Sequence, residues 1–256
     1  MIARLLSAIA LAAAVVSLPV TARADEAGYV YSYGLYTGRY DDYIISVDAY
    51  KPVGRTTPIR PYVDLYEYRD SRTQPGANFP LILSDNYLLQ AAGVQWTTPK
   101  GLRAFVQTGL SETFGPVAAQ PSGSDTRGGV QYYREWGAAF APGRGYGNLY
   151  ASDTYFSRYS DWIEYSQIEL GRNQYSAKNT VQPFVRFVLN LDTHGYYWSN
   201  LTEATAGVRF HPFGRRGPSI SIEGVFGAYV RGIPLPAGTN PTYWDFRPTI
   251  SYGANI

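Results

Sequence analysis

A one-residue alternation of apolar and polar side chains near residue 250 constrains the fold more than any other feature of the chain. Over residues 243–254, the apolar face holds Trp244, Phe246, Pro248, Ile250, Tyr252 and Ala254, and the other face holds Asp245, Arg247, Thr249 and Ser251. Successive side chains of a β-strand point to opposite faces, so this strand separates an apolar environment from a polar one. A helix would spread the same apolar residues around its whole circumference.

The same alternation recurs in the segments 102–110, 181–192, 202–211 and 219–231. We therefore predict an all-β fold, an antiparallel up-and-down transmembrane β-barrel of about 12 strands. Tyrosine occupies both faces of the first three segments, so a count of about ten, or of more than about twelve, stays open. The predicted strands are 28–37, 42–51, 60–69, 86–97, 102–111, 128–140, 147–158, 162–174, 181–192, 201–211, 218–231 and 242–254.

The start of the chain has the pattern of a cleavable export signal. An apolar run extends from Leu5 to Leu18, and Ala22-Arg23-Ala24 has the small-x-small form of a cleavage site. The run is too short to cross ~30 Å of hydrocarbon, although an uncleaved anchor helix is the alternative interpretation. We predict a signal peptide over residues 1–24 and one barrel domain over residues 25–256.

Composition argues against several other classes of protein. The chain has no cysteine, hence no disulfide and no thiolate site, and we predict neither a metal site nor a cofactor. Without residues 1–24 the basic and acidic residues are equal in number, which argues against nucleic-acid binding. Many of the 24 tyrosines crowd the predicted strand ends, as tyrosine does at membrane–water interfaces. The predicted partner of the outer face is therefore outer-membrane lipid, and a soluble barrel with an aromatic core is the alternative.

The connections between the predicted strands differ in length. Short connectors with turn residues lie near 52–59, 98–101, 142–146 and 213–217, and longer ones run over about 70–85, 112–127 and 232–241. Outer-membrane barrels have short turns on the periplasmic side and long loops on the other. If the strand count is right, the short connectors belong to the periplasmic side.

Charged residues and tyrosine on the polar faces are the candidate functional residues. The predicted lumen-lining set is Arg103, Arg186, Asp192, Glu203, Arg209, Glu223, Tyr229, Arg231, Asp245 and Arg247. Opposite charges in a narrow barrel must pair, because unpaired buried charges are costly. The set therefore fits a structural salt-bridge network as well as a transport path, and lumenal Phe184, Tyr229 and Tyr243 fit stacking surfaces for sugars.

Catalysis is a further interpretation of the two histidines. His194 follows Asp192-Thr193, and either His194 or His211 is a conceivable base in a hydrolytic site. The chain has no Gly-x-Ser-x-Gly elbow, no His-Glu-x-x-His and no P-loop. We therefore predict that the protein is not an enzyme, and we assign no catalytic residues.

Several short motifs carry a resemblance to a known family. They are Tyr68-Arg69-Asp70-Ser71-Arg72, Ser84-Asp85-Asn86-Tyr87 leading to Ala92-Gly93-Val94-Gln95, Asp125-Thr126-Arg127-Gly128-Gly129 and Tyr150-Ala151-Ser152-Asp153-Thr154-Tyr155-Phe156-Ser157-Arg158-Tyr159. With these motifs, the stretch from about 62 to 232 resembles the C-terminal barrel region of the phage N-four adsorption protein A family of outer-membrane proteins.

The resemblance implies an exopolysaccharide-export barrel, and some members of the family serve as phage receptors. Members commonly carry a periplasmic helical-repeat region before the barrel, whereas the predicted strands here follow the signal directly. The implied partners are therefore a polysaccharide and a separate periplasmic export protein.

Together these observations predict an outer-membrane β-barrel involved in export of a surface polysaccharide, or serving as a surface receptor. Its lumen would be polar and passive, gated by the longer loops. The alternatives are an outer-membrane enzyme that modifies lipid or glycan, and a structural barrel with no conduit.

Overall fold

The computed structural model describes residues 28–54, 57–71, 85–114, 121–174, 180–196, 199–214 and 217–255. The predicted signal peptide, 1–24, lies outside the described residues. Within the described ranges, no helix has the length and apolar character needed to cross a bilayer.

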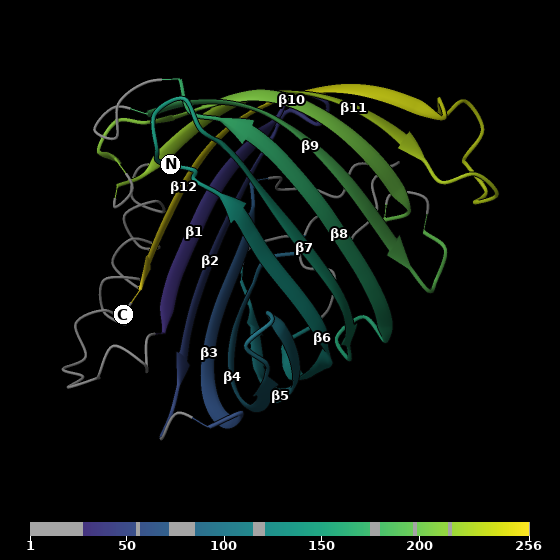
Figure 1. The fold of residues 1–256 in the computed structure, drawn as a ribbon. Coiled ribbons are helices and arrows are strands. Elements are labelled where there is room, and N and C mark those ends of the chain that lie inside the picture. Colours follow the sequence, from purple (N-terminus) through teal and green to yellow (C-terminus); the bar gives the residue numbers. More distant parts are fainter. Residues whose placement is uncertain are drawn as a thin grey trace.

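The strands form one closed antiparallel barrel, in which each strand pairs with its neighbours along the chain (Figure 1). The strands are β1 (Tyr29–Thr37), β2 (Asp42–Pro52), β3 (Ile59–Asp70), β4 (Tyr87–Thr97), β5 (Leu102–Thr113), β6 (Gly123–Gly137), β7 (Gly145–Phe156), β8 (Asp161–Arg172), β9 (Thr180–Asp192), β10 (Leu201–His211), β11 (Ser219–Tyr229) and β12 (Thr242–Asn255). Pairing of β1 with β12, from Tyr29↔Asn255 to Leu35↔Thr249, closes the sheet. The predicted all-β antiparallel barrel and its strand count are confirmed.

Five predicted strands differ from the observed ones by two or more residues at an end: 102–111, 128–140, 147–158, 162–174 and 218–231. The span 128–140 is observed as β6, Gly123–Gly137, because the ladder to β5 continues down to Gly123 and a positive φ of 80° at Gly137 begins the turn. Glycine and serine had made the start of β6 look like loop. The span 218–231 ends two residues early, at Tyr229, where a turn with a positive φ of 95° at Gly232 begins. Arg231 therefore lies in an exposed turn and not on a lumenal strand face.

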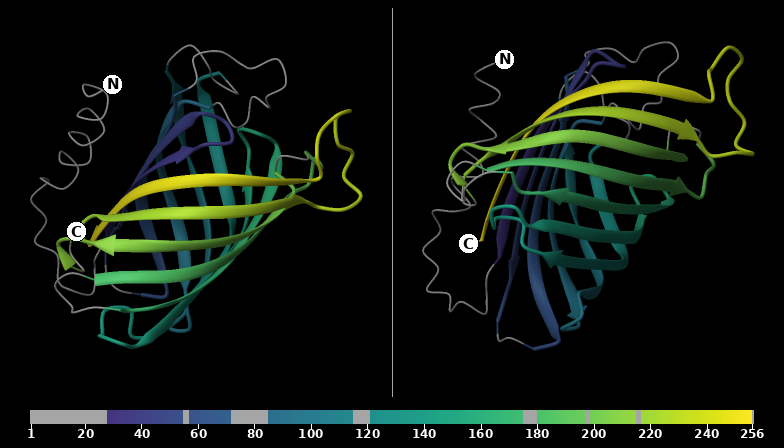
Figure 2. Two further views of the ribbon diagram at one scale, coloured as in Figure 1. Left: turned by 90° about the horizontal axis from the view of Figure 1, so that it is seen from above. Right: turned by 45° about the horizontal axis from the view of Figure 1, so that its top comes forward.

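Antiparallel order fixes which connections share an end of the barrel. The predicted short connectors near 52–59, 98–101, 142–146 and 213–217 all follow even-numbered strands and share one end, here called the short-turn end. The connections that contain the predicted long loops follow odd-numbered strands and share the opposite end, the long-loop end. In Figure 2 the connection 230–241 (yellow) projects beyond the wall at that end.

The two faces of the sheet have opposite chemistry. On β11, Ile220 and Ile222 point outward and are 46% and 57% exposed, whereas Ser221 and Glu223 point inward and are 5% and 4% exposed. The outward faces of β5, β9, β10 and β12 repeat this pattern with Val106, Leu110, Phe187, Val208, Trp244, Phe246 and Ile250. An apolar exterior around a polar interior is the reverse of a water-soluble fold and matches a wall that faces lipid.

Gly207 and Gly224 show how tightly the interior is packed compared with the exterior. A Cβ added at inward-facing Gly207 would lie 2.8 Å from the Phe184 ring and 2.9 Å from the Ile222 carbonyl oxygen. A Cβ added at outward-facing Gly224, on the neighbouring strand, would meet only the Ala206 carbonyl oxygen, at 3.9 Å.

We predict that Gly207→Ala lowers the free energy of unfolding by ~1–3 kcal/mol, because the added methyl displaces the Phe184 ring. The matched variant Gly224→Ala should change it by less than about 1 kcal/mol. Urea unfolding of the micelle-bound barrel, followed by tryptophan fluorescence, measures both. Equal losses in the two variants would contradict the packing described for the lumen.

Candidate functional site in the barrel lumen

Glu169 on β8 is the centre of an ion-pair network in the short-turn half of the lumen. Its carboxylate accepts hydrogen bonds from Arg186 Nη2 at 3.0 Å and from Arg209 Nη1 at 2.8 Å. Arg186 Nη1 reaches Glu223 Oε2 at 3.2 Å. The sheet register builds the cluster, since Glu169 lies directly opposite Arg186 on β9. Two arginines and two carboxylates neutralise one another, and these four residues are called the Glu169 network.

A second network, formed by Glu203, Asp245 and Arg247, lies in the long-loop half. Arg247 Nη1 is 2.7 Å from Glu203 Oε2, and Arg247 Nε is 2.7 Å from Asp245 Oδ2. Asp245 also accepts hydrogen bonds from Thr37 Oγ1 and from the Arg39 amide, both at 2.9 Å. These bonds tie the β1–β2 turn to β12 at the seam where the barrel closes.

Aromatic rings line the lumen beside both networks. The Arg39 guanidinium lies 3.7 Å from the centre of the Tyr243 ring, which in turn is 5.5 Å from the Tyr229 ring. Phe184 lies under Arg209, with 4.6 Å between the guanidinium carbon and the ring centre. The rings that were candidates for sugar stacking therefore hold arginine side chains in this structure.

The remaining predicted site residues lie apart from the two networks. Arg103 on β5 donates to Gln131 Oε1 at 3.1 Å and lies over the Tyr50 ring at 4.8 Å. Asp192, at the end of β9, accepts a hydrogen bond from the Tyr196 amide at 3.1 Å. Arg231 lies outside the lumen, in the turn after β11.

A third cluster, absent from the predicted site set, lies at the long-loop end on the β4–β8 side of the barrel. Arg158, in the β7–β8 turn, forms a two-pronged ion pair with Asp85: Nε to Oδ2 is 2.9 Å and Nη2 to Oδ1 is 3.0 Å. Arg158 Nη1 also donates to Ser111 Oγ at 2.9 Å and to the Pro121 carbonyl at 3.1 Å. These contacts join the β7–β8 turn to β5 and to the start of β4. Asp85, Arg158, Ser111 and the adjacent Tyr159 are called the Asp85 network.

Tyr159 strengthens this cluster, since its phenol donates to Asp85 Oδ2. Burial, and then the negative charges around it, raise the pKa of Tyr159 well above its ordinary value. The phenol therefore remains a protonated donor at physiological pH.

The motifs that carry the family resemblance converge on this cluster. The Asp70 amide donates to Asn86 Oδ1 at 3.0 Å, which joins the first two motifs. Arg127, from the third motif, pairs with Asp125 at 2.8 Å and donates to the Tyr87 hydroxyl at 3.0 Å. Asp85 and Arg158 join the second motif to the fourth. Membership of these motifs was the sequence signal that could have placed Asp85, Arg127 and Arg158 among the site residues.

Tyrosine rings pack along the inner wall at mid-height. The Tyr87 ring on β4 lies 5.8 Å from the Tyr66 ring and 6.4 Å from the Tyr68 ring on β3, between ring centres. The Tyr150 ring on β7 lies 6.0 Å from the Tyr165 ring on β8. These inward-facing rings occupy part of the lumen.

An open cavity of about 770 Å³ remains at the short-turn end. Tyr31, Glu135, Arg209, His211, Ser219 and Ser251 contribute side chains to its lining. The β6–β7 connection, 138–144, also lines it and is held in place by side chains from β9, from the end of β10 and from the residue that follows β8. Asn173 Nδ2 donates to the Ala141 carbonyl at 3.1 Å, Gln182 Nε2 donates to the Ala139 carbonyl, and the Phe140 ring lies 5.1 Å from the His211 ring.

The structure does not bring the two histidines together. His194 lies at the long-loop end, where its Nδ1 is 3.2 Å from Asp161 Oδ1. His211 lies at the short-turn end, where its Nε2 is 3.0 Å from Gln182 Oε1. A site that uses both imidazoles is therefore excluded. Within the described part of the chain, no group of three or more histidine or acidic residues could hold a metal ion.

No protein-family model and no curated protein matches this sequence. Among solved structures, the β domain of the Bordetella autotransporter BrkA is similar with a TM-score of 0.43 and 14% identity, over 90% of this chain and 100% of that one. The NanC porin is similar with a TM-score of 0.41 and 10% identity, over 87% and 98%. A bacterial polysaccharide outer membrane secretin is similar with a TM-score of 0.40 and 10% identity, over 91% and 100%. These low values carry no functional argument.

We predict that Glu169→Gln lowers the free energy of unfolding by ~3 kcal/mol, because Arg186 and Arg209 then share one carboxylate in a confined space. Urea unfolding measures the change. The control is Glu112→Gln, which removes an exposed carboxylate from β5 and should cost less than about 1 kcal/mol. A small loss in both variants would mean that lumenal water solvates the arginines.

Proposed function

We propose that the protein is an outer-membrane β-barrel that passes a polysaccharide chain from the periplasm to the cell surface through a gated lumen. The apolar exterior supports the membrane placement, because large side chains such as Ile222, Phe246 and Ile250 would otherwise face water. The short-turn end then faces the periplasm and the long-loop end faces the exterior.

The observation that carries the proposal is the cavity of about 770 Å³ at the short-turn end, where the β6–β7 connection forms part of the lining. Tyr31 is 44% exposed there although its side chain points inward, so one aromatic ring is free to meet a ligand. Ser219, Ser251, Arg209 and Glu135 surround it with hydroxyl and charged groups. An exposed ring amid hydrogen-bonding groups suits a sugar, which has apolar C–H faces and polar edges.

The β6–β7 connection is the proposed gate of this cavity. It is held by hydrogen bonds to Arg172, Asn173 and Gln182 and by one aromatic contact, whereas the β-ladders hold the wall itself. Five hydrogen bonds join the connection to the residues at the end of β8 and to β9, and they contribute about 5 kcal/mol in total, which is less than the cost of separating two strands along a full ladder. The motifs that resemble the exopolysaccharide-export family support the same substrate class.

We predict low conductance for the unaltered barrel in planar bilayers and more frequent opening in Phe140→Ala and Gln182→Ala, which weaken the attachment of the gate. The matched control is Phe213→Ala, which truncates an exposed phenylalanine on the β10–β11 turn at the same end. Opening that rises equally in all three variants would reflect general loosening and would contradict a specific gate.

In cells, we predict that deletion of the gene removes the polysaccharide from the medium and leaves polymer in the periplasm. Complementation with the unaltered gene should restore release. Unchanged secretion in the deletion strain, with the barrel shown to be expressed in the parent, would rule out the export function.

A surface receptor with no conduit is the second candidate, and the Asp85 network favours it. Its ion pair and hydrogen bonds join three connections at the long-loop end, which makes a rigid exterior surface there. Conductance that stays absent in Phe140→Ala and Gln182→Ala, together with unchanged secretion, would favour this function over export.

A further inference from the structure

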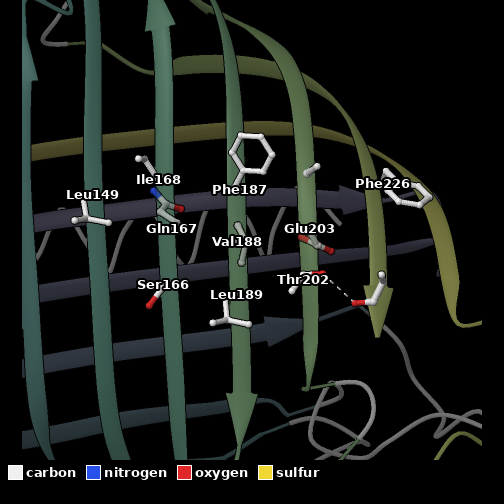
Figure 3. Close-up of a pocket in the computed structure, with 12 residues that line it drawn as sticks. Leu149, Ser166, Gln167, Ile168, Phe187, Val188, Leu189, Thr202, Glu203 and Phe226 are labelled. Carbon is white, nitrogen blue, oxygen red and sulfur yellow. Dashed lines mark hydrogen bonds between the residues drawn. The ribbon is translucent and has the colours of Figure 1, made fainter. Parts of the chain in front are cut away.

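An apolar groove of about 500 Å³ crosses the outward face of the wall from β7 to β11 (Figure 3). Its floor consists of small or short side chains, and its borders consist of large apolar ones. The floor residues are Ser166, Thr202, Ala204 and Ala228, and the bordering residues are Leu149, Ile168, Phe187, Leu189 and Phe226.

The register of the strands shows why a hollow forms there. Ala204 lies directly opposite Phe187 on one side and Phe226 on the other, so a methyl group sits between two rings. Thr202 lies opposite Leu189 and Ala228 in the same way. Because outward side chains along one row are neighbours, alternating small and large residues leave a groove rather than a flat wall.

Two carboxylates lie next to the groove on the side of the long-loop end. Asp153 on β7 and Glu164 on β8 are a directly opposed pair on the outward face, and both are exposed. The next row toward the short-turn end is Ala151↔Ser166, where the groove begins. Among the described residues, neither carboxylate has an ion-pair or hydrogen-bond partner.

Aromatic side chains place this pair at the edge of the hydrocarbon. Tyr155 and Trp162 form the row beyond the carboxylates, with ring centres 5.6 Å apart. Tyrosine and tryptophan gather at the membrane–water interface. From the long-loop end toward the middle of the barrel, the outer wall therefore presents first the interfacial aromatic rings, then the two negative charges and then the apolar groove.

We propose that this surface binds one phospholipid with an ammonium headgroup, its acyl chain in the groove and its amine between Asp153 and Glu164. The proposal rests on the membrane placement argued above. Like charges directly opposed on neighbouring strands are destabilising, and outward charges near hydrocarbon are costly. An ammonium group offsets both costs, because it brings a positive charge and hydrogen-bond donors to the two carboxylates.

Other occupants fit this surface less well. An anionic lipid would place a phosphate against two carboxylates with no positive headgroup charge to offset it. A second copy of the chain in a two-fold contact would bring the same acidic pair of each copy into one interface, which adds like charges. The ammonium phospholipid is the occupant whose charge complements the wall.

The test is native mass spectrometry of the barrel released from vesicles that contain equal amounts of phosphatidylethanolamine and phosphatidylglycerol with identical chains. The unaltered protein should retain one phosphatidylethanolamine in preference to phosphatidylglycerol. The double variant Asp153→Asn/Glu164→Gln should lose that preference, with retention about fivefold lower, as expected for the loss of two exposed ion pairs. Ala204→Phe, which fills the floor, should reduce retention of both lipids.

Two matched variants separate these effects from general disturbance of the wall. Glu112→Gln removes an outward carboxylate at the long-loop end of β5, and Ala92→Phe adds a ring to the outward face of β4, both away from the groove. Neither should change lipid retention. Lipid loss in these controls, retention of phosphatidylglycerol equal to that of phosphatidylethanolamine, or a lipid-free dimer would each overturn the proposal.

Failure of the membrane placement has a different signature. A protein that does not float with vesicles and shows no heat-dependent change in gel migration is not a membrane barrel, and the proposed function then fails with the lipid site. A protein that floats and is heat-modifiable, but retains lipid without headgroup preference, rejects the lipid site alone.

Discussion

Closure of the sheet by the β1–β12 pairing satisfies the backbone groups of what would otherwise be two edge strands. This matters because the exterior is apolar, and an unpaired amide or carbonyl facing hydrocarbon would cost several kcal/mol. Closure also determines which side chains fill the interior, since it forces alternate side chains of every strand into a confined space. Bonds from Thr37 and Arg39 to Asp245 reinforce this seam from within, so the interior chemistry and the closure support each other.

Confinement in turn requires that charges be compensated. In the Glu169 network two arginines meet two carboxylates, and in the second network one arginine meets two carboxylates with Arg39 close by. Ion pairs of this kind add little net stability to the folded barrel, because the cost of burying the ions offsets their attraction. Removing one partner lowers the free energy of unfolding strongly, since the other charge is then left buried and unpaired. The lumen therefore resists single changes, and motion is most easily accommodated at its ends, where connections rather than ladders fill the mouth.

Much of this architecture could be predicted from the sequence. Because the outer face of the barrel is apolar and the inner face is polar, each strand appears in the sequence as a one-residue alternation of apolar and polar side chains. Strand β10 was predicted at its observed bounds since Ala204, Ala206, Val208 and Phe210 alternate strictly with polar residues. Strand β6 was shifted because Gly123, Ser124 and Asp125 resemble a loop, although Asp125 pairs with Arg127 inside the barrel. The Asp85 network escaped prediction because it forms between connections far apart in sequence. The alternation of apolar and polar residues identifies strands, but it carries no information about which connections contact one another.

Strand β8 shows how the position of a residue in the strand decides whether its charge faces the lumen or the exterior. Glu169 faces inward and meets two arginines, whereas Glu164, on the same strand, faces outward beside Asp153. The alternation in this strand is weaker than in β10 because Ile163 points inward and Glu164 outward. The inward charges of the Glu169 network find partners on neighbouring strands, since the barrel brings those strands together. Outward charges must find theirs in the surroundings, so Glu164 and Asp153 say more about what the wall contacts than the paired charges of the lumen say about what passes through it.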